Sequence, residues 1–565
     1  MASPNSVLIV GAGPTGLCLA LALLKNGVPV RIIDKLPTPR IGQKGNGIQP
    51  RTLEILYSLG LLDDVFKRSC HIKSLVVYEM PGATKIAKEI TLTPQVEPTP
   101  DKPFPNSRAM GQDRFEALLV AHLERLGGTV ERGVELRNFT QDATKVSAEL
   151  AKVDGSIEHA DFEFLVGCDG GHSPVRHILN LSFLGETREG EGMFVGDIII
   201  KKGISDEYWH CFNGTGTGLG ATPGVKAEGA SGALQVDTFI FRTAEIPGLS
   251  TVMATGPKIE DVQQRFSTCD GLIQAFYEVT GRTDVEFGEQ LCGWWWRPNI
   301  RMVDTFGVGR AFVAGDAAHT HSPTGGQGMN SSIQDAYNLA WKIALVHKKL
   351  APPTLLETYS TERLPVIAAM LQKTTDLLNK TMAAFQKGVA DPNVTNEAWE
   401  RGGELQQFGV NYRGSTIVLD ERNPPEEGVI PSAYGSGAGG VRAGDRAPSA
   451  PIKGLGHGAE KLFDVFSPTR HTVLVFTEVE EKVRGVLEQV KTWPEGVAEV
   501  VVVAPKGKAA EVAGAKVVED VEGHARSIYQ VEQDPTIVVV RPDGAVGAIV
   551  LEAAGISRYF SKILA

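Results

Sequence analysis

The sequence predicts a mixed α/β protein of several domains, in which a parallel βαβ nucleotide-binding domain is interrupted by an antiparallel sheet and followed by a smaller α/β domain. Three observations carry this prediction. The chain has 565 residues, more than one hydrophobic core usually supports. A strand, a glycine-rich turn and a helix open it. Strand-like segments then dominate residues 186–296.

Bulk composition excludes several classes of protein. The chain is 42% hydrophobic and 22% charged, which is typical of a soluble globular protein. A formal charge of −11, without any run of Lys or Arg, argues against nucleic-acid binding. The six cysteines include no CxxC pair, so we expect neither a metal site nor disulfides, and a reducing, cytoplasmic location. Because no apolar span reaches 18 residues, we expect no stable membrane insertion.

The N-terminal βαβ unit carries a dinucleotide-binding motif. Val7 to Val10 predict a strand that runs into the turn Gly11-Ala-Gly-Pro-Thr-Gly16 and then a helix. Gly11 permits the tight turn, Gly13 the approach of a pyrophosphate, and Gly16 the packing of helix on strand. Asp34 ends the next strand, 18 residues after Gly16, where it would hold a ribose. The motif does not separate NAD from FAD, and a purely structural turn is the alternative.

Two later strands also end at an acid. The first begins near Phe164 and ends at Asp169-Gly170, before a helix start at Ser173 and Pro174. The second reaches Asp316, crosses a glycine-rich turn and enters a helix over 331–346. A carboxylate at a strand end accepts hydrogen bonds from a polyol, and a helix N-terminus favours an electron-rich ligand. This combination suits a flavin.

The inserted segments predict a second, mostly antiparallel sheet that covers a ligand. Its strands are expected at 74–93, 193–200, 233–241 and 290–296, with a helix over 259–278. Substrate contacts are expected from this sheet, above all from Tyr208-Trp-His-Cys211, Arg242 and Trp294-Trp-Trp296. The alternative is a packing role, because aromatic residues in alternating strands commonly fill cores.

The C-terminal part predicts a separate small α/β domain. Residues 424–447 are rich in Pro, Gly and Ser and predict a linker. Beyond it, strands at 473–476, 497–504 and 536–541 accompany a helix over 480–491, and Asp543-Gly544 predicts a hairpin turn. No cysteine occurs in this domain.

Taken together, these motifs resemble those of the FAD-dependent aromatic hydroxylases of the para-hydroxybenzoate and phenol hydroxylase type, the group A flavoprotein monooxygenases. The three fingerprints are Gly-Ala-Gly-Pro-Thr-Gly at 11–16, Cys-Asp-Gly-Gly-His-Ser-Pro-Val-Arg at 168–176, and Gly-Arg-Ala-Phe-Val-Ala-Gly-Asp-Ala-Ala-His at 309–319. Further matches are Pro50-Arg-Thr-Leu-Glu54, Gln112 and the stretch 323–342. The tail resembles the thioredoxin-like domain of the phenol hydroxylase branch, through 444–448 and 540–544, but lacks the thiols that thioredoxin chemistry needs.

The resemblance implies a domain plan and a homodimer. A Rossmann-like FAD-binding domain would comprise 1–73, 106–185 and 297–423. The substrate domain would comprise 74–105 and 186–296, followed by the linker and a thioredoxin-like domain at 448–565.

The resemblance also implies how FAD lies. Adenosine would rest on the Gly11 turn and Asp34, the pyrophosphate near Asp169 and Arg51, the ribityl chain on Asp316 and the flavin ring by 323–330. The residues expected at the cofactor are Gly11, Gly13, Pro14, Thr15, Gly16, Asp34, Lys35, Arg51, Gln112, Asp169, Gly315, Asp316, Pro323, Gly326, Gly328, Met329 and Asn330.

The implied reaction is hydroxylation of a small phenolic or related aromatic substrate, in which NAD(P)H reduces FAD and O2 then forms a C4a-hydroperoxide. Asn46 stands where phenol hydroxylase-like members tend to have an aspartate, and an amide cannot act as a base. Tyr208 and His210 are the expected substitutes, and Asn46 and Pro323 are expected at the reacting centre too. The alternatives are oxidative decarboxylation, dearomatisation or Baeyer–Villiger oxygenation, an NAD(P)H oxidase or reductase, and a non-enzymatic flavin-binding protein.

Overall fold

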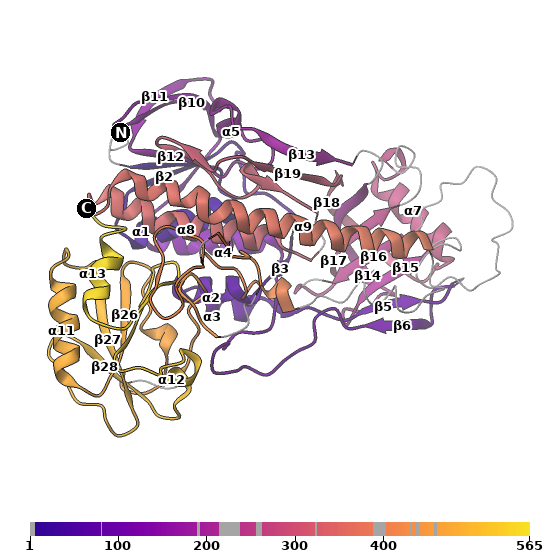
Figure 1. Cartoon of the computed structure of the whole chain (residues 1–565). Helices are drawn as coiled ribbons and strands as arrows, with labels where there is room; N and C mark the ends of the chain where they lie inside the picture. Colours follow the sequence, from indigo (N-terminus) through magenta and orange to yellow (C-terminus); the bar gives the residue numbers. More distant parts are fainter. Residues whose placement is uncertain are drawn as a thin grey trace.

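Three large sheets and the helices packed on them form the body of the molecule (Figure 1). The structure, a computed structural model, describes residues 6–565 except 44, 81, 189–191, 214–237, 244, 256–262, 323–324, 388–402, 427, 430, 436–439 and 457–459. In the described part, no helix is both long and apolar enough to cross a membrane.

The first sheet is six-stranded and parallel at its centre, as the βαβ motif predicts. Its order is β20 (Gly307–Val308), β21 (Ala311–Val313), β12 (Phe164–Gly167), β1 (Val7–Val10), β2 (Val30–Asp34) and β8 (Val130–Arg132). Every residue of β1 and β12 is buried, which explains their uninterrupted apolar runs. Because β1, β2 and β12 are parallel, their carboxyl ends meet at one edge of the sheet.

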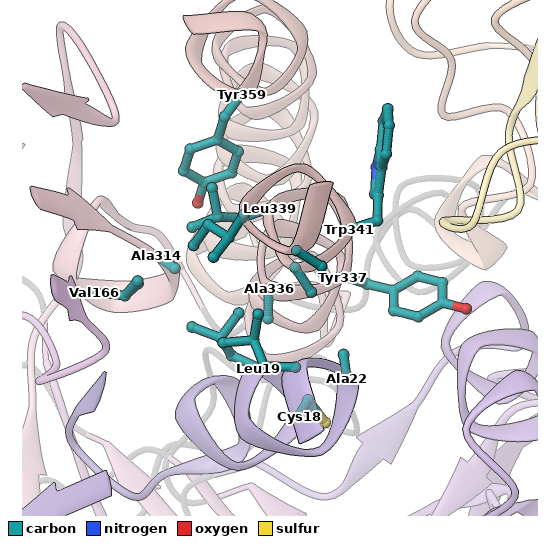
Figure 2. Close-up of a cluster of buried hydrophobic side chains, with 14 of the residues drawn as sticks. Cys18, Leu19, Ala22, Val166, Ala314, Ala336, Tyr337, Leu339, Trp341 and Tyr359 are labelled. Atoms are coloured by element: carbon teal, nitrogen blue, oxygen red, sulfur yellow. The ribbon is translucent and has the colours of Figure 1, made fainter. Parts of the chain in front are cut away.

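Helices cover this sheet and share its core. They are α1 (Pro14–Lys25), α4 (Gln112–Arg125), α8 (Gly328–His347) and the long α9 (Glu357–Lys387). In Figure 2, Leu19 and Ala22 of α1 point toward Ala336 and Leu339 of α8, and Tyr359 of α9 lies beside them. From there, α9 runs toward the second sheet (Figure 1).

Shorter elements complete this region. They are β3 (Gly47–Ile48), α2 (Pro50–Ser58), α3 (Leu62–Arg68), β4 (Cys70–His71), β7 (Arg108–Ala109), β9 (Val134–Gln141), β10 (Val146–Lys152), β11 (Ile157–Phe162), α5 (Pro174–Ile178), β13 (Phe183–Thr187), β19 (Asn299–Val303), η1 (Gly315–Ala317), β22 (His319–Thr320), η2 (Pro353–Leu356) and η3 (Gly403–Gln406).

The second sheet is the predicted antiparallel insertion. Its seven strands follow the order β18 (Glu286–Trp296), β14 (Met193–Lys202), β17 (Leu249–Thr255), β16 (Thr238–Thr243), β15 (Trp209–Asn213), β5 (Leu75–Tyr78) and β6 (Ile86–Ile90). Only the β5–β15 pair is parallel. The helix α7 (Cys269–Thr280) packs on one face through a phenylalanine-rich cluster. Parts of the predicted segments 233–241 and 259–278 lie outside the described residues.

The third sheet belongs to the C-terminal part. It runs in the order β23 (Leu419–Asp420), β30 (Val546–Val550), β29 (Thr536–Val540), β26 (His471–Phe476), β27 (Ala498–Pro505) and β28 (Lys516–Asp520). The elements beside it are β24 (Pro451–Ile452), β25 (Glu460–Lys461), η4 (Leu462–Asp464), α11 (Glu480–Lys491), α12 (His524–Ile528) and α13 (Ala554–Phe560). The predicted hairpin at Asp543-Gly544 joins the antiparallel strands β29 and β30.

The structure divides the C-terminal part differently from the predicted linker and domain. β23 precedes the predicted linker, yet it pairs with β30. Within the linker, Asp445 accepts a hydrogen bond from Arg413 Nε at 2.6 Å, and the Gly444 N–H donates to the Val546 carbonyl at 2.6 Å. Side chains of β26 and α13 belong to the same buried cluster as α1 and α8. Composition indicated a linker at 424–447, and it does not report these backbone and core contacts.

Candidate active site

A cavity of about 620 Å3 opens between the first sheet, the start of α8 and one face of the second sheet. Its lining includes the carboxyl ends of β1, β2 and β12, where ligands of parallel α/β sheets bind. Its volume lies within the range of sites for cofactors and drug-sized ligands. The strand ends that the sequence singled out are thus brought together.

The glycine turn after β1 forms one wall. Gly11 has a φ of +103°, and a Cβ there would lie 2.4 Å from the Cys168 carbonyl oxygen, so only glycine fits between the neighbouring strands. A Cβ on Gly13 would meet nothing within 4 Å, which leaves its backbone open to the cavity. Gly16 lies behind the turn, where a Cβ would lie 2.0 Å from the Gly11 carbonyl oxygen. Pro14 and Thr15 complete this wall.

Asp34 is fastened to the same turn. Its Oδ2 accepts from the Ala12 N–H at 2.9 Å, and its Oδ1 accepts from the Leu36 N–H at 2.9 Å. Each oxygen retains a lone pair for a hydroxyl of a ligand. The neighbouring Lys35 is exposed and lines the same end of the cavity.

Asp169 follows β12 and keeps one unused acceptor. Its Oδ2 accepts from the Val175 N–H at 3.2 Å, while the buried Oδ1 has no hydrogen-bond partner in the structure. Burial raises the pKa of this carboxyl. An unpartnered buried oxygen beside a cavity fits a ligand that brings a donor.

Asp316 lines the cavity, and the turn that carries it is held by a hydrogen bond to the buried Asp335. Gly315 adopts a φ of +64° and donates its N–H to Asp335 Oδ2 at 3.0 Å. The fully buried Asp335 also accepts from His319 Nε2 at 2.7 Å and Arg363 Nε at 2.7 Å. Burial alone would raise the pKa of Asp335, but Arg363 and His319 outweigh it and hold that pKa below its usual range. The sequence did not assign His319, Asp335 and Arg363 to the support of this turn. Ionisable residues within apolar segments are rarely buried without a partner, and this pattern could have pointed to them.

The start of α8 supplies the next wall through Gly326, Gly328 and Met329. Asn330, which the sequence assigned to the cofactor, does not line the cavity. Its Oδ1 accepts from the Gln49 N–H at 2.8 Å, and its Nδ2 donates to the Gly47 carbonyl at 2.9 Å, so it ties α8 to β3. Pro323 lies outside the described residues.

Gln112 lines the cavity from the start of α4, as expected, whereas Arg51 does not. Gln112 Nε2 donates to Glu116 Oε1 at 2.8 Å. Arg51 Nη1 donates to Glu54 at 2.8 Å, and its Nη2 donates to the Asp543 carbonyl at 2.9 Å. Arg51, which the resemblance placed near the pyrophosphate, is thus bound by protein acceptors outside the cavity lining.

The far wall is one face of the second sheet. Cross-strand neighbours place Trp294 beside Val195, and Trp296 beside Met193, because side chains two apart share a face. Most of this wall is aromatic or apolar, and Arg242 adds a charge. The residues of this face are Met193, Val195, Trp209, Arg242, Met253, Trp294 and Trp296. Trp295 also reaches the cavity lining, although its cross-strand neighbour Phe194 belongs to the cluster on the opposite face.

His210 and Tyr208 do not face this wall. Trp209 starts β15 and lines the cavity, so the next residue, His210, points to the opposite face. There its Nε2 donates to the Ser205 carbonyl at 2.7 Å and its Nδ1 accepts from Tyr78 Oη at 2.8 Å. Burial lowers the pKa of His210 to about 4. Tyr208 is half-buried outside the cavity lining, so neither residue is placed to ionise a substrate there.

Asn46 does line the cavity. It is 5% exposed, and its Nδ2 has no hydrogen-bond partner. An unpartnered amide donor beside a cavity fits a ligand with an acceptor oxygen.

These features fit FAD, and comparisons with known proteins agree. A family model described as an FAD binding domain matches residues 5–374. A flavin-dependent monooxygenase of Mycobacteroides abscessus is 31% identical over 99% of this chain and 100% of its own. Pentachlorophenol 4-monooxygenase of Sphingobium chlorophenolicum is 28% identical over 98% of this chain and 94% of its own.

Solved structures share the fold over the whole chain. The flavin-dependent monooxygenase PieE, in complex with FAD and substrate, has a TM-score of 0.78 at 22% identity, covering 99% of this chain and 98% of its own. Aklavinone-11 hydroxylase, with FAD and aklavinone, has a TM-score of 0.73 at 23% identity with the same coverage. With the family model spanning most of the chain, the protein belongs to the FAD-binding group A flavoprotein monooxygenases, the aromatic-hydroxylase family.

Proposed function

We propose that the protein binds FAD in this cavity and uses NAD(P)H and O2 to hydroxylate a phenolic or related aromatic compound held against the second sheet. One observation carries the proposal: the glycine turn, the carboxylates of Asp34, Asp169 and Asp316, and the aromatic wall line one continuous cavity. A polyol-bearing, flat cofactor and a flat substrate would meet within it.

In the proposed arrangement, the adenosine ribose lies on Asp34, and the pyrophosphate lies by the Gly11 turn and Asp169. The ribityl chain lies on Asp316, and the ring lies by 326–329 with Gln112 on its flank. The fixed carboxylate geometry supports this assignment, since hydroxyls need acceptors already held in place.

Bound FAD supplies the redox chemistry, in which NAD(P)H is the reductant and O2 the oxidant. The chain supplies the environment. The N-terminus of α8 places partial positive charge by the proposed ring position, which favours the negative charge of a reduced flavin. The aromatic wall excludes water, and the unpartnered Asn46 amide orients an acceptor oxygen of the substrate.

The test begins with the cofactor. Purified protein should be yellow and release FAD on denaturation, whereas a colourless protein that cannot be reconstituted would refute the proposal. Asp316→Ala should abolish FAD retention, and Asp304→Asn, an exposed carboxylate outside the cavity lining, should not. Normal flavin occupancy in the Asp316 variant would overturn the ribityl assignment.

The reaction is tested with a panel of substituted phenols and hydroxybenzoates. NADPH and NADH consumption and product mass should be followed together. Substrate-stimulated oxidation with a product heavier by one oxygen supports hydroxylation. Peroxide as the sole product across the panel would instead indicate an NAD(P)H oxidase.

For the C-terminal part, we propose a thioredoxin-like domain with a structural role. A central sheet with helices beside it supports this, and the absence of cysteine from residues 448–565 leaves no thiol chemistry. A homodimer in the cytoplasm completes the proposal, and light scattering of the FAD-loaded protein tests the oligomeric state.

A further inference from the structure

Arg242 is a charged side chain in the cavity wall. It lies on β16 and lines the cavity beside its cross-strand neighbour Trp209, with the guanidinium carbon 5.7 Å from the ring centroid. Its Nε is buried without a hydrogen-bond partner. Among the residues that the structure describes, no carboxylate forms a salt bridge with it.

Asp197 is the acid best placed to pair with Arg242, but its oxygens accept hydrogen bonds from other groups. Asp197 lies on β14, and its cross-strand neighbour Thr251 also pairs with Arg242 in the sheet. Asp197 Oδ1 accepts from Thr251 Oγ1 at 2.8 Å, and its Oδ2 accepts from the Gln43 N–H at 2.8 Å. The carboxylate thus holds Gln43 onto the sheet. Its charge acts on Arg242 through space, but its hydrogen bonds go to other groups, and the guanidinium remains available to a ligand.

Donors without acceptors are gathered on this side of the cavity. Besides Arg242 Nε, the indole N–H of Trp209 and the amide of Asn46 are buried and unpartnered. All three residues line the cavity. A buried donor without an acceptor is costly, and a guanidinium out of water is the costliest of the three. The complementary ligand is therefore an aromatic ring that brings an acidic oxygen.

We propose that Arg242 binds the acidic oxygen of an aromatic substrate, a phenolate or a ring carboxylate, and makes the enzyme select anionic rings. The proposal rests on the proposed function. Of the residues expected to ionise a substrate, Asn46 cannot take a proton and His210 points away from the cavity, whereas a guanidinium favours the ionised form of a phenol by its charge.

The test measures binding rather than turnover. FAD-loaded protein is titrated by calorimetry with 2-naphthol, 2-naphthoic acid, 2-methoxynaphthalene and methyl 2-naphthoate. The wild type should bind at least one acidic probe about tenfold or more tightly than its methylated partner, since a hydrogen bond to a charged group is worth about 1.5–3 kcal/mol. The phenol and acid arms show which oxygen Arg242 takes. Equal affinity within both pairs overturns the proposal.

Variants then assign the effect to the residue. Arg242→Met should remove most of the discrimination within the pair, and Arg242→Lys should restore part of it. Arg265→Met, which removes an arginine of the same domain outside the cavity lining, should preserve it. Unchanged discrimination in Arg242→Met overturns the proposal, and if that variant does not fold, the wild-type comparison decides. Failure to retain FAD would instead refute the proposed function, so the two failures are distinguishable.

Discussion

Replacement of Asp335 by asparagine should destabilise the protein by about 3–5 kcal/mol, because the change leaves a buried guanidinium without its counter-ion. The carboxylate is fully buried and serves three partners, the Gly315 N–H at 3.0 Å, His319 Nε2 at 2.7 Å and Arg363 Nε at 2.7 Å. An amide keeps the shape but removes the charge. The expected loss is a large share of the stability of an ordinary domain.

The same substitution should weaken FAD binding about tenfold or more, the cost of losing one hydrogen bond to a charged acceptor. The Gly315 N–H belongs to the turn that carries Asp316, so its release loosens the proposed ribityl contact. FAD titration of the folded protein measures this separately from stability.

Urea unfolding of the FAD-free protein, followed by tryptophan fluorescence, measures the stability change. Asp304→Asn serves as the control because that carboxylate is exposed. The double variant Asp335→Leu with Arg363→Met should lose less stability than the two single variants added together, because it leaves neither charge alone. If Asp335→Asn unfolds within about 1 kcal/mol of the wild type and binds FAD normally, the positioning argument is refuted.

Three further predictions concern other buried ionisable side chains. Burial and Arg541 lower the pKa of His471 to about 3, so its contribution to stability is complete above about pH 6.5 and decreases as pH falls toward 3, by about 2 kcal/mol between pH 7 and 5. His471→Leu should reduce that dependence in urea titrations at several pH values, and an unchanged dependence would contradict the assignment. Arg541→Met should cost about 3–5 kcal/mol and expose the C-terminal sheet to limited proteolysis, because the buried Asp543 loses its ion pair and Glu362, although still paired with Lys342, loses bonds at 2.7 and 2.9 Å; protease resistance equal to the wild type would contradict this. His210→Phe should lower Tm but leave the pH profile of kcat/KM unchanged, since the imidazole faces away from the cavity; a displaced profile would make it a candidate base again.

The secondary structure of the C-terminal part was easier to predict than its packing against the rest of the chain. The helix expected over 480–491 is observed as α11 with the same bounds, and the hairpin at Asp543-Gly544 is present, because amphipathic period and turn chemistry are local. Docking depends on contacts between residues far apart in sequence. Arg541 meets Glu362, and Asp543 Oδ2 accepts from Asn338 and from Trp341 at 3.2 Å. Composition therefore indicated a linker at 424–447 but not the contacts that this part of the chain makes.

By itself, the sequence determined at which edge of the first sheet the cavity lies. A glycine turn after a buried strand, and acids at the ends of later strands, have one geometric consequence, since parallel strands end at one edge of a sheet. Gly11, Asp34 and Asp316, which the sequence singled out, all line the cavity.

Only the tertiary structure decided which side chains face that cavity. A shift of one residue along β15 separates Trp209, which lines it, from His210, which does not. Arg51 and Asn330 carry donors that suit a ligand, yet both are bound by protein partners distant in sequence. In the described part of the chain Arg242 forms no salt bridge, and the acid two strands away, Asp197, accepts hydrogen bonds from Thr251 and Gln43. Residue type sets what a side chain can bind, whereas its partners are set by strand register and by long-range packing.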